Sequence, residues 1–120
     1  MTQTEKSTAP LPADAAQALQ EVIRVTSAVL EAAQAESQAI ARNDALAFAG
    51  AQADKAAAEP RYTAACRAFH ARAEEFRGVP GLERLLALQN DLSRTAQANN
   101  AALGPMLAKA KEKIRVEDAS

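Results

Sequence analysis

Cys66 and His70 are the residues best suited to chemistry, since they are the chain's only cysteine and only histidine. Their spacing places both on one face of a helix, where they could form a reactive pair or half of a metal site. No second Cys/His cluster or row of carboxylates completes such a site, and the sequence contains no Gly-rich phosphate loop. We therefore expect no enzyme, no metal ion and no cofactor, and a packing role for Cys66.

Four basic residues near the C-terminus suggest a second chemistry, contact with nucleic acid or a membrane surface. They alternate with other residues instead of lining one helical face, and acidic residues stand among and after them. The formal net charge of −1 argues against broad attraction to nucleic acid. We expect a solvated helix end and no nucleic-acid partner. The residues are Lys109, Lys111, Lys113 and Arg115.

The amino-acid composition indicates which kind of secondary structure carries the residues described above. The chain has 120 residues, 48% of them apolar and 24% charged, which indicates one domain. Ala accounts for 32 of the apolar residues and larger side chains for 26, so any core must be narrow. With 4 Gly, 5 Pro and few β-branched residues, strands are not expected. The single cysteine permits no internal disulfide and suits a reducing compartment.

The two ends of the chain look unlike the middle. The start of the sequence, MTQTEKSTAPLPADAA, is polar and lacks the apolar core of a signal peptide, and no later window approaches about 18 consecutive apolar residues. We expect neither secretion nor membrane insertion, and a cytoplasmic location. Residues 1–12 are predicted to be a disordered lead and residues 117–120 a disordered tail, with one helical domain over residues 13–116.

Residues 13–42 predict the first helix. Asp14 is its expected N-cap, and at its end Asn43 favours a left-handed turn and Asp44 caps the next helix. Residues spaced alternately three and four positions apart form one row along this helix, which we call its seam. Such a heptad spacing is typical of helices that pack against one another. The seam consists of Leu19, Ile23, Thr26, Leu30, Ala33, Ser37 and Ile40.

Residues 44–77 predict the second helix, with a bend rather than a break at Pro60 and an exposed Lys55. Its seam begins with small residues and continues with aromatic ones. The Gly78 to Gly81 segment, GVPG, predicts a chain reversal after it. The predicted seam consists of Leu46, Ala49, Ala53, Ala56, Tyr62, Cys66, Phe69, Ala73 and Phe76.

The third helix is predicted from residue 82, where the longest seam begins. Gly104-Pro105 interrupts it, so the last stretch is expected to be a hinged C-terminal helical segment. The predicted fold is all-α, an antiparallel helical bundle or coiled coil of three long helices. Asn99 on this seam is either buried, fixing the register or the oligomeric state, or exposed to solvent. The seam consists of Leu82, Leu85, Gln89, Leu92, Ala96, Asn99, Leu103, Met106, Ala110 and Ile114.

Four motifs follow one another along these helices: ESQAIARNDALAF at 36–48, ADK at 53–55, GVPGL at 78–82 and LQNDLSRTAQANNAAL at 88–103. In this order they resemble the FlgN-type flagellar export chaperone family. Pro60 and the many Ala residues depart from the family pattern. The resemblance implies a cytoplasmic chaperone that holds hook–filament junction (hook-associated) proteins and delivers them to the type III export apparatus for flagellum assembly, without catalysis.

The resemblance also implies that the client contacts the C-terminal helical region, about residues 92–114 here. An apolar stripe after the expected hinge independently suits a helical partner, although it could instead complete the chain's own core. The rival class is a structural coiled-coil or adaptor protein that self-associates, for example as a homodimer, without an export client. The predicted partner-binding residues are Asn99, Leu103, Met106, Leu107, Ala110 and Ile114.

Overall fold

The computed structural model describes the backbone of residues 11–119 and the side chains of residues 11–106 and Ala108. It contains three long helices, α2 (Ala15–Ala41), α3 (Ala45–Ala71) and α4 (Leu82–Ala119), and a short 3₁₀ helix, η1 (Ala73–Phe76). No strand occurs in this part of the chain, which confirms the all-α prediction.

The predicted caps form as the sequence indicates. The Asp14 carboxylate accepts a hydrogen bond from the backbone N–H of Gln17 (2.9 Å), and the Asp44 carboxylate accepts one from Ala47 (3.0 Å). Asn43 takes the left-handed conformation with φ of 55°. Asp14 thus begins α2, and Asn43 and Asp44 form the tight turn that ends α2 and begins α3, because the capping carboxylates satisfy backbone groups that a helix start leaves free.

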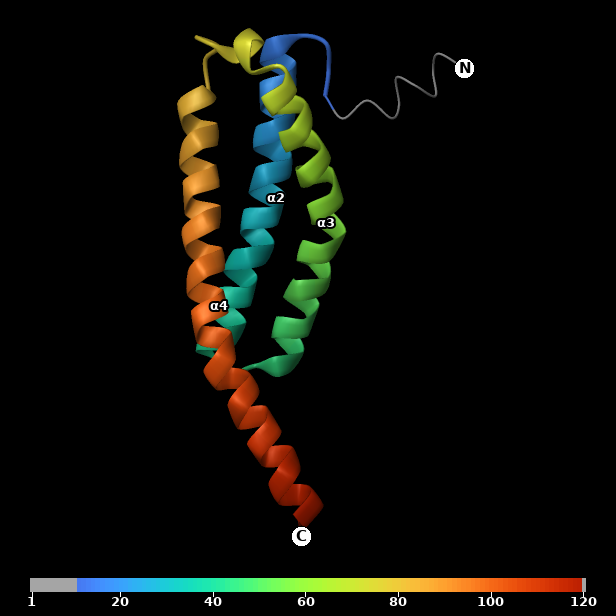
Figure 1. Cartoon of the computed structure of the whole chain (residues 1–120), viewed down its shortest axis with the longest axis vertical. Coiled ribbons are helices and arrows are strands. Elements are labelled where there is room, and N and C mark those ends of the chain that lie inside the picture. Colours follow the sequence, from blue (N-terminus) through green and yellow to red (C-terminus); the bar gives the residue numbers. More distant parts are fainter. Residues whose placement is uncertain (1–10, 120) are drawn as a thin grey trace, which may run out of the picture.

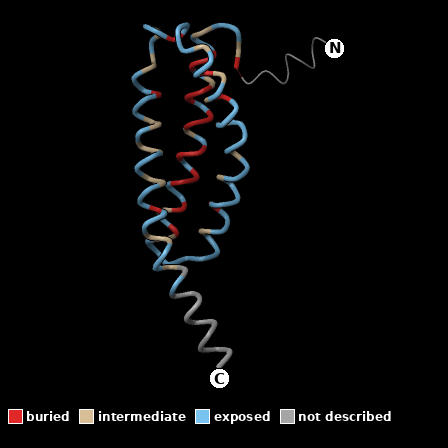
Figure 2. Tube along the Cα trace, in the orientation of Figure 1, coloured by how far each residue is buried: buried red, intermediate tan, exposed pale blue. Residues whose placement is uncertain are grey.

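Helix α2 is the element that both other long helices pack against, whereas α3 and α4 make little direct contact with each other. Figure 1 shows α2 running down, α3 returning beside it, and α4 running down again in the direction of α2. The buried positions concentrate on α2 (Figure 2). The predicted seam on this helix is confirmed: its first five members are buried and its last two half-buried.

The largest side chains gather at one end of the molecule, where α2 begins and α4 starts. Phe76 and Leu85 are at most 1% exposed there, and the rings of Phe69 and Phe76 lie 4.7 Å apart. We call this region the apolar half. Its buried residues are Leu11, Ala18, Leu19, Val22, Ile23, Val25, Ala65, Phe69, Phe76 and Leu85.

The second helix ends earlier than predicted. α3 stops at Ala71 and the chain tightens into η1, whereas a helix to residue 77 was expected. The Arg72 guanidinium donates hydrogen bonds to the carbonyls of Pro12 (2.7 Å) and Ala13 (2.8 Å) and lies over the Phe76 ring. The tighter turn places Phe76 in the core, which explains the shortened helix.

The predicted start of the α3 seam is wrong. Leu46 is 85% exposed, and Ala49, Ala53 and Ala56 are exposed as well. The helix instead turns Ala51 toward the interior, together with Ala65 and Phe69 further along. The side of α3 that packs on α2 is therefore the one that carries these three residues, and not the one that the seam of Leu46 predicted.

Both long helices that contain proline continue through it. α3 runs unbroken through Pro60 and is bowed in Figure 1, as the prediction of a bend rather than a break requires. α4 is also a single helix through Pro105, and it changes direction near the point where it leaves the other helices (Figure 1). A separate last helix is therefore not formed, and motion at Gly104-Pro105 stays a prediction.

The ends of the folded region differ from the predicted ones. Leu11 is 8% exposed and belongs to the core, although the predicted lead included it; residues 1–10 lie outside the described part. At the other end α4 extends to Ala119, so residues 117–119 are helical rather than part of a disordered tail. Ser120 lies outside the described residues.

Candidate functional site

The predicted partner-binding residues occupy the second half of α4. Asn99 is 8% exposed, and Leu103 and Met106 are half-buried. The side chains of Leu107, Ala110 and Ile114 lie outside the described residues.

Asn99 is committed to a contact between helices. Its Nδ2 donates a hydrogen bond to the carbonyl of Ala33 (2.9 Å), and its Oδ1 accepts one from the Ser37 hydroxyl (2.7 Å). Both ends of the amide are thus satisfied by α2. Of the two alternatives that the sequence leaves open, the buried one is correct, and Asn99 is not available to a partner while α4 is docked.

A second polar contact, which the sequence analysis missed, joins α2 to α3. Lys55 Nζ lies 3.0 Å from Glu36 Oε1, and the two side chains are 29% and 3% exposed, respectively. The expectation of an exposed Lys55 is therefore wrong. A signal was present, because Glu36 continues the spacing of Val22 and Val29 on the buried side of α2.

Glu36, Lys55 and Asn99 lie at the end of the molecule away from Phe69 and Phe76, and the aromatic residue at their own end, Phe48, is half-buried. The neighbouring buried positions on α2 and α3 hold mainly Ala. We call this region the polar half, and it contains residues 29–41 of α2, 45–58 of α3 and 92–106 of α4. Polar contacts, rather than large apolar side chains, distinguish it from the apolar half.

Cys66 lies between α3 and α4. Gln89 Nε2 donates a weak hydrogen bond to Cys66 Sγ (3.9 Å). Burial raises the pKa of the nearby Tyr62 to about 12, and Cys66 adds to this rise. His70 is exposed and packs edge-on against Phe69. These contacts give Cys66 a packing environment.

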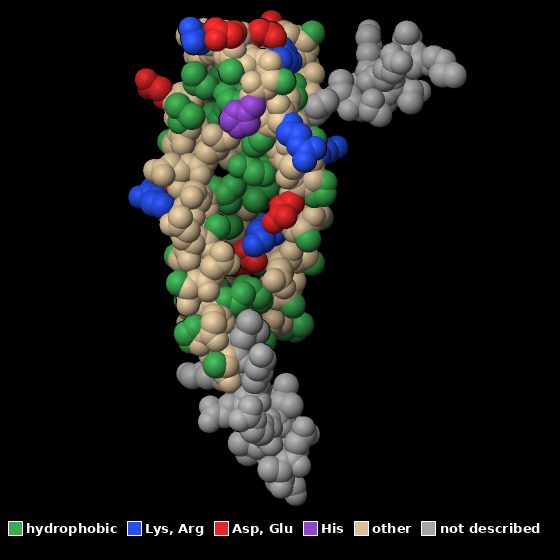
Figure 3. Space-filling model, in the orientation of Figure 1, with side chains coloured by type: hydrophobic (Ala, Val, Ile, Leu, Met, Phe, Trp, Pro, Cys, Tyr) green, Lys and Arg blue, Asp and Glu red, His purple; other side chains and the backbone are tan. Residues whose placement is uncertain are grey.

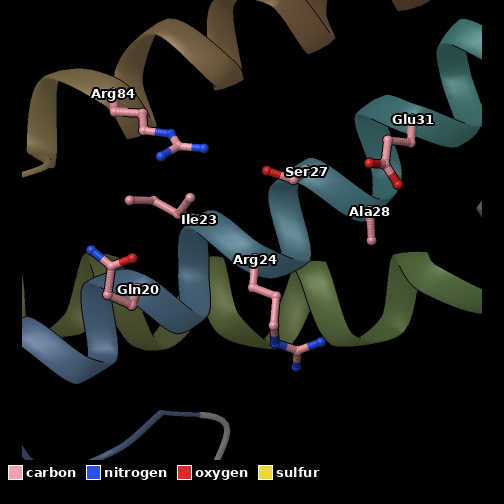
Figure 4. A pocket seen from close by; sticks show the side chains of 7 residues that line it. All are labelled: Gln20, Ile23, Arg24, Ser27, Ala28, Glu31 and Arg84. Atoms are coloured by element: carbon pink, nitrogen blue, oxygen red, sulfur yellow. The ribbon is translucent and has the colours of Figure 1, made fainter.

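Metal and small-molecule sites find little support in the described residues. No group of three or more His, Cys, Asp or Glu side chains is placed there to hold a metal ion. Figure 4 shows a hollow between α2 and α4 in which charged groups do not converge, since Arg24 turns away from Arg84 and pairs with Glu21. Its lining residues are Gln20, Ile23, Arg24, Ser27, Ala28, Glu31 and Arg84.

The projecting end of α4 is the remaining candidate. α4 has 38 residues and α2 and α3 have 27 each, and Figure 1 shows α4 continuing well past the other two helices. On the side shown in Figure 3, hydrophobic side chains line the strip between α3 and α4 that leads toward this end. We therefore take this segment of α4 as the candidate site.

None of the helices in the described part of the chain combines the length and the apolar character that a membrane span requires.

The chain matches no known protein-family model, and the searches of curated proteins and of solved structures find no significant match.

Proposed function

We propose that this chain is a non-enzymatic chaperone whose α4 holds a helical segment of a client protein. The observation that carries the proposal is the length of α4, which outruns the helices that could cover it. Residues 104–119 correspond to about 24 Å of helix at about 1.5 Å per residue, enough for several turns of contact with a client helix.

The sequence of this region supports an apolar contact. Leu103 and Met106 are half-buried at the point where α4 leaves the other helices, and Leu107, Ala110 and Ile114 continue the stripe by helical spacing. An amphipathic client helix would pack its apolar face against such a stripe. The flexible thioether of Met106 would adapt to different client side chains.

The resemblance to FlgN-type chaperones supports a client class. On this proposal the clients are hook–filament junction proteins, which the chain holds in the cytoplasm and delivers to the type III export apparatus. Gly104-Pro105 would let the projecting segment change its angle when a client binds.

A titration with a hook–filament junction protein tests this function. Replacing Leu107 and Ile114 together by Ser should remove about 2–4 kcal/mol of apolar contact and weaken binding by well over tenfold. The matched control replaces Lys109 and Glu112 by Ser, which conserves net charge and falls on the other side of the helical period. If the Leu107/Ile114 variant keeps its affinity for the client, with helicity and melting unchanged, the client binds elsewhere on the chain.

The second candidate is self-association without a client. The observation behind it is the exposure of Leu46 (85%) and Leu86 (53%), large apolar side chains that contact with a second copy of the chain would bury. Sedimentation equilibrium would show a concentration-dependent dimer that Leu46→Gln or Leu86→Gln weakens. A monomer over the accessible concentration range would exclude this candidate.

A further inference from the structure

The two halves of α4 are held to α2 in different ways. In the apolar half, Leu85 is 0% exposed and belongs to the core, and Leu82 and Leu88 pack against the same core. Gly81, just before the helix, lies against Leu19 and Ile23 of α2. The start of α4 is therefore part of the most densely apolar region of the molecule.

In the polar half, Asn99 is the one buried residue among the described side chains of α4 from residue 92 onward. Its partners, Ala33 and Ser37, are small, so they offer little apolar area to hold the helix. α3 does not hold this part of α4 either, because the two helices make little direct contact. Asn99 thus makes the buried contact of this part of α4, beside the half-buried Leu92, Leu103 and Met106.

We infer that α4 docks in two separable parts and that the hydrogen bonds between Asn99, Ala33 and Ser37 act as a latch for the second part. When the latch opens, α4 separates from α2 beyond about residue 92 while Leu85 stays in the core. Opening gives up these hydrogen bonds and the partial burial of Leu92 and Leu103, so it costs less than release of the completely buried Leu85.

The latch gives the proposed client site a form of regulation. Leu92, Ala96 and Leu103 lie on the seam that leads into the projecting segment, and they are half-buried while α4 is docked. Opening exposes them as a continuation of the client stripe, so docking on α2 and binding of a client compete for the same face. This consequence rests on the proposed function, whereas the latch itself requires no client.

Native-state hydrogen exchange on the full chain, without client, tests the latch. The test variant is Asn99→Ala and the matched control is Asn100→Ala, an exposed neighbour of the same type. Both changes raise helix propensity equally, so their difference reports the latch. An undocked helical segment unravels readily in water, because short isolated helices are marginally stable. In Asn99→Ala, amides of residues 93–103 should therefore exchange about tenfold faster than in the control, while residues 18–26 of α2 exchange at an unchanged rate.

Equal acceleration across α2 and all of α4 would overturn the inference, because the helix would then open only with the whole fold. Equal rates in the Asn99 and Asn100 variants would overturn it as well. If Asn99→Ala does not fold, Ser37→Ala removes one of the two hydrogen bonds and should give a smaller acceleration confined to the same segment. Absence of client binding would refute the proposed function without altering these exchange rates, so the two failures are distinguishable.

Discussion

The apolar half and the polar half hold the three helices together with different kinds of side chain. In the apolar half, Leu19, Phe76 and Leu85 are at most 1% exposed and fill the space between the helices. In the polar half, Glu36 of α2 pairs with Lys55 of α3, and the buried Asn99 of α4 bonds to Ala33 and Ser37 of α2. Apolar burial stabilises in proportion to area but is not directional, whereas hydrogen bonds and ion pairs require particular partners. Where the contact between helices consists mainly of Ala, which has no large side chain to interlock, polar groups specify how the helices are aligned along one another.

The largest expected effect comes from removing bulk in the apolar half. Phe76→Ala should lower the free energy of unfolding by about 3–5 kcal/mol, because the side chain is 1% exposed and packs against Phe69. Urea unfolding followed by circular dichroism measures the change. A loss below about 1 kcal/mol would remove the distinction between the halves.

Two leucines of α4 sharpen the comparison. Leu85→Ala should cost about 2–5 kcal/mol, because Leu85 is completely buried in the apolar half. Leu92→Ala should cost about 1–2 kcal/mol, because Leu92 is half-buried in the polar half. Both variants make the same chemical change in the same helix, so their denaturation midpoints compare directly. Equal losses would show that the two halves are equally well packed.

The next largest effect on stability is expected from the ion pair between Lys55 and Glu36 in the polar half. Lys55→Ala leaves the 3% exposed Glu36 carboxylate without its partner and should cost about 1–3 kcal/mol. The loss is smaller than for a fully buried pair, because Lys55 keeps contact with solvent. Arg94→Ala is the control: it breaks the surface pair with Asp91 and should be nearly neutral. A neutral Lys55→Ala would show that Glu36 is satisfied in another way.

The smallest effect concerns Tyr62, where α3 faces α4. Its pKa of about 12 means that the folded chain keeps the phenol proton at pH values where an unfolded tyrosine, with an ordinary value of 10.0, has lost it. Stability from this group is complete below pH 10 and declines as pH rises toward 12. Ultraviolet titration of this single tyrosine measures the pKa, and Cys66→Ala should lower it. A midpoint near 10 in the folded chain would contradict the burial of Tyr62.

Local signals determined the start of α2 and the turn that joins it to α3. Asp14, Asn43 and Asp44 act through backbone groups within a few residues of themselves, so the sequence alone predicts the start of α2, the turn and the start of α3. The seam of α2 was equally predictable, because large side chains recur on one side of that helix. The all-α class followed from the same patterns.

Tertiary structure alone decided which face of α3 is buried and which polar residues meet. Eight of the fourteen residues from 45 to 58 are Ala, so several faces of this helix are equally apolar and periodicity cannot choose between them. The face that packs on α2 is the one that carries Ala51, Lys55 with its partner Glu36, and, further along the helix, Phe69. Likewise the spacing of Asn99 left it either buried or exposed until Ala33 and Ser37, more than sixty residues earlier, were placed beside it. Contacts between distant segments leave no period in the sequence, because each depends on how whole helices are positioned in space.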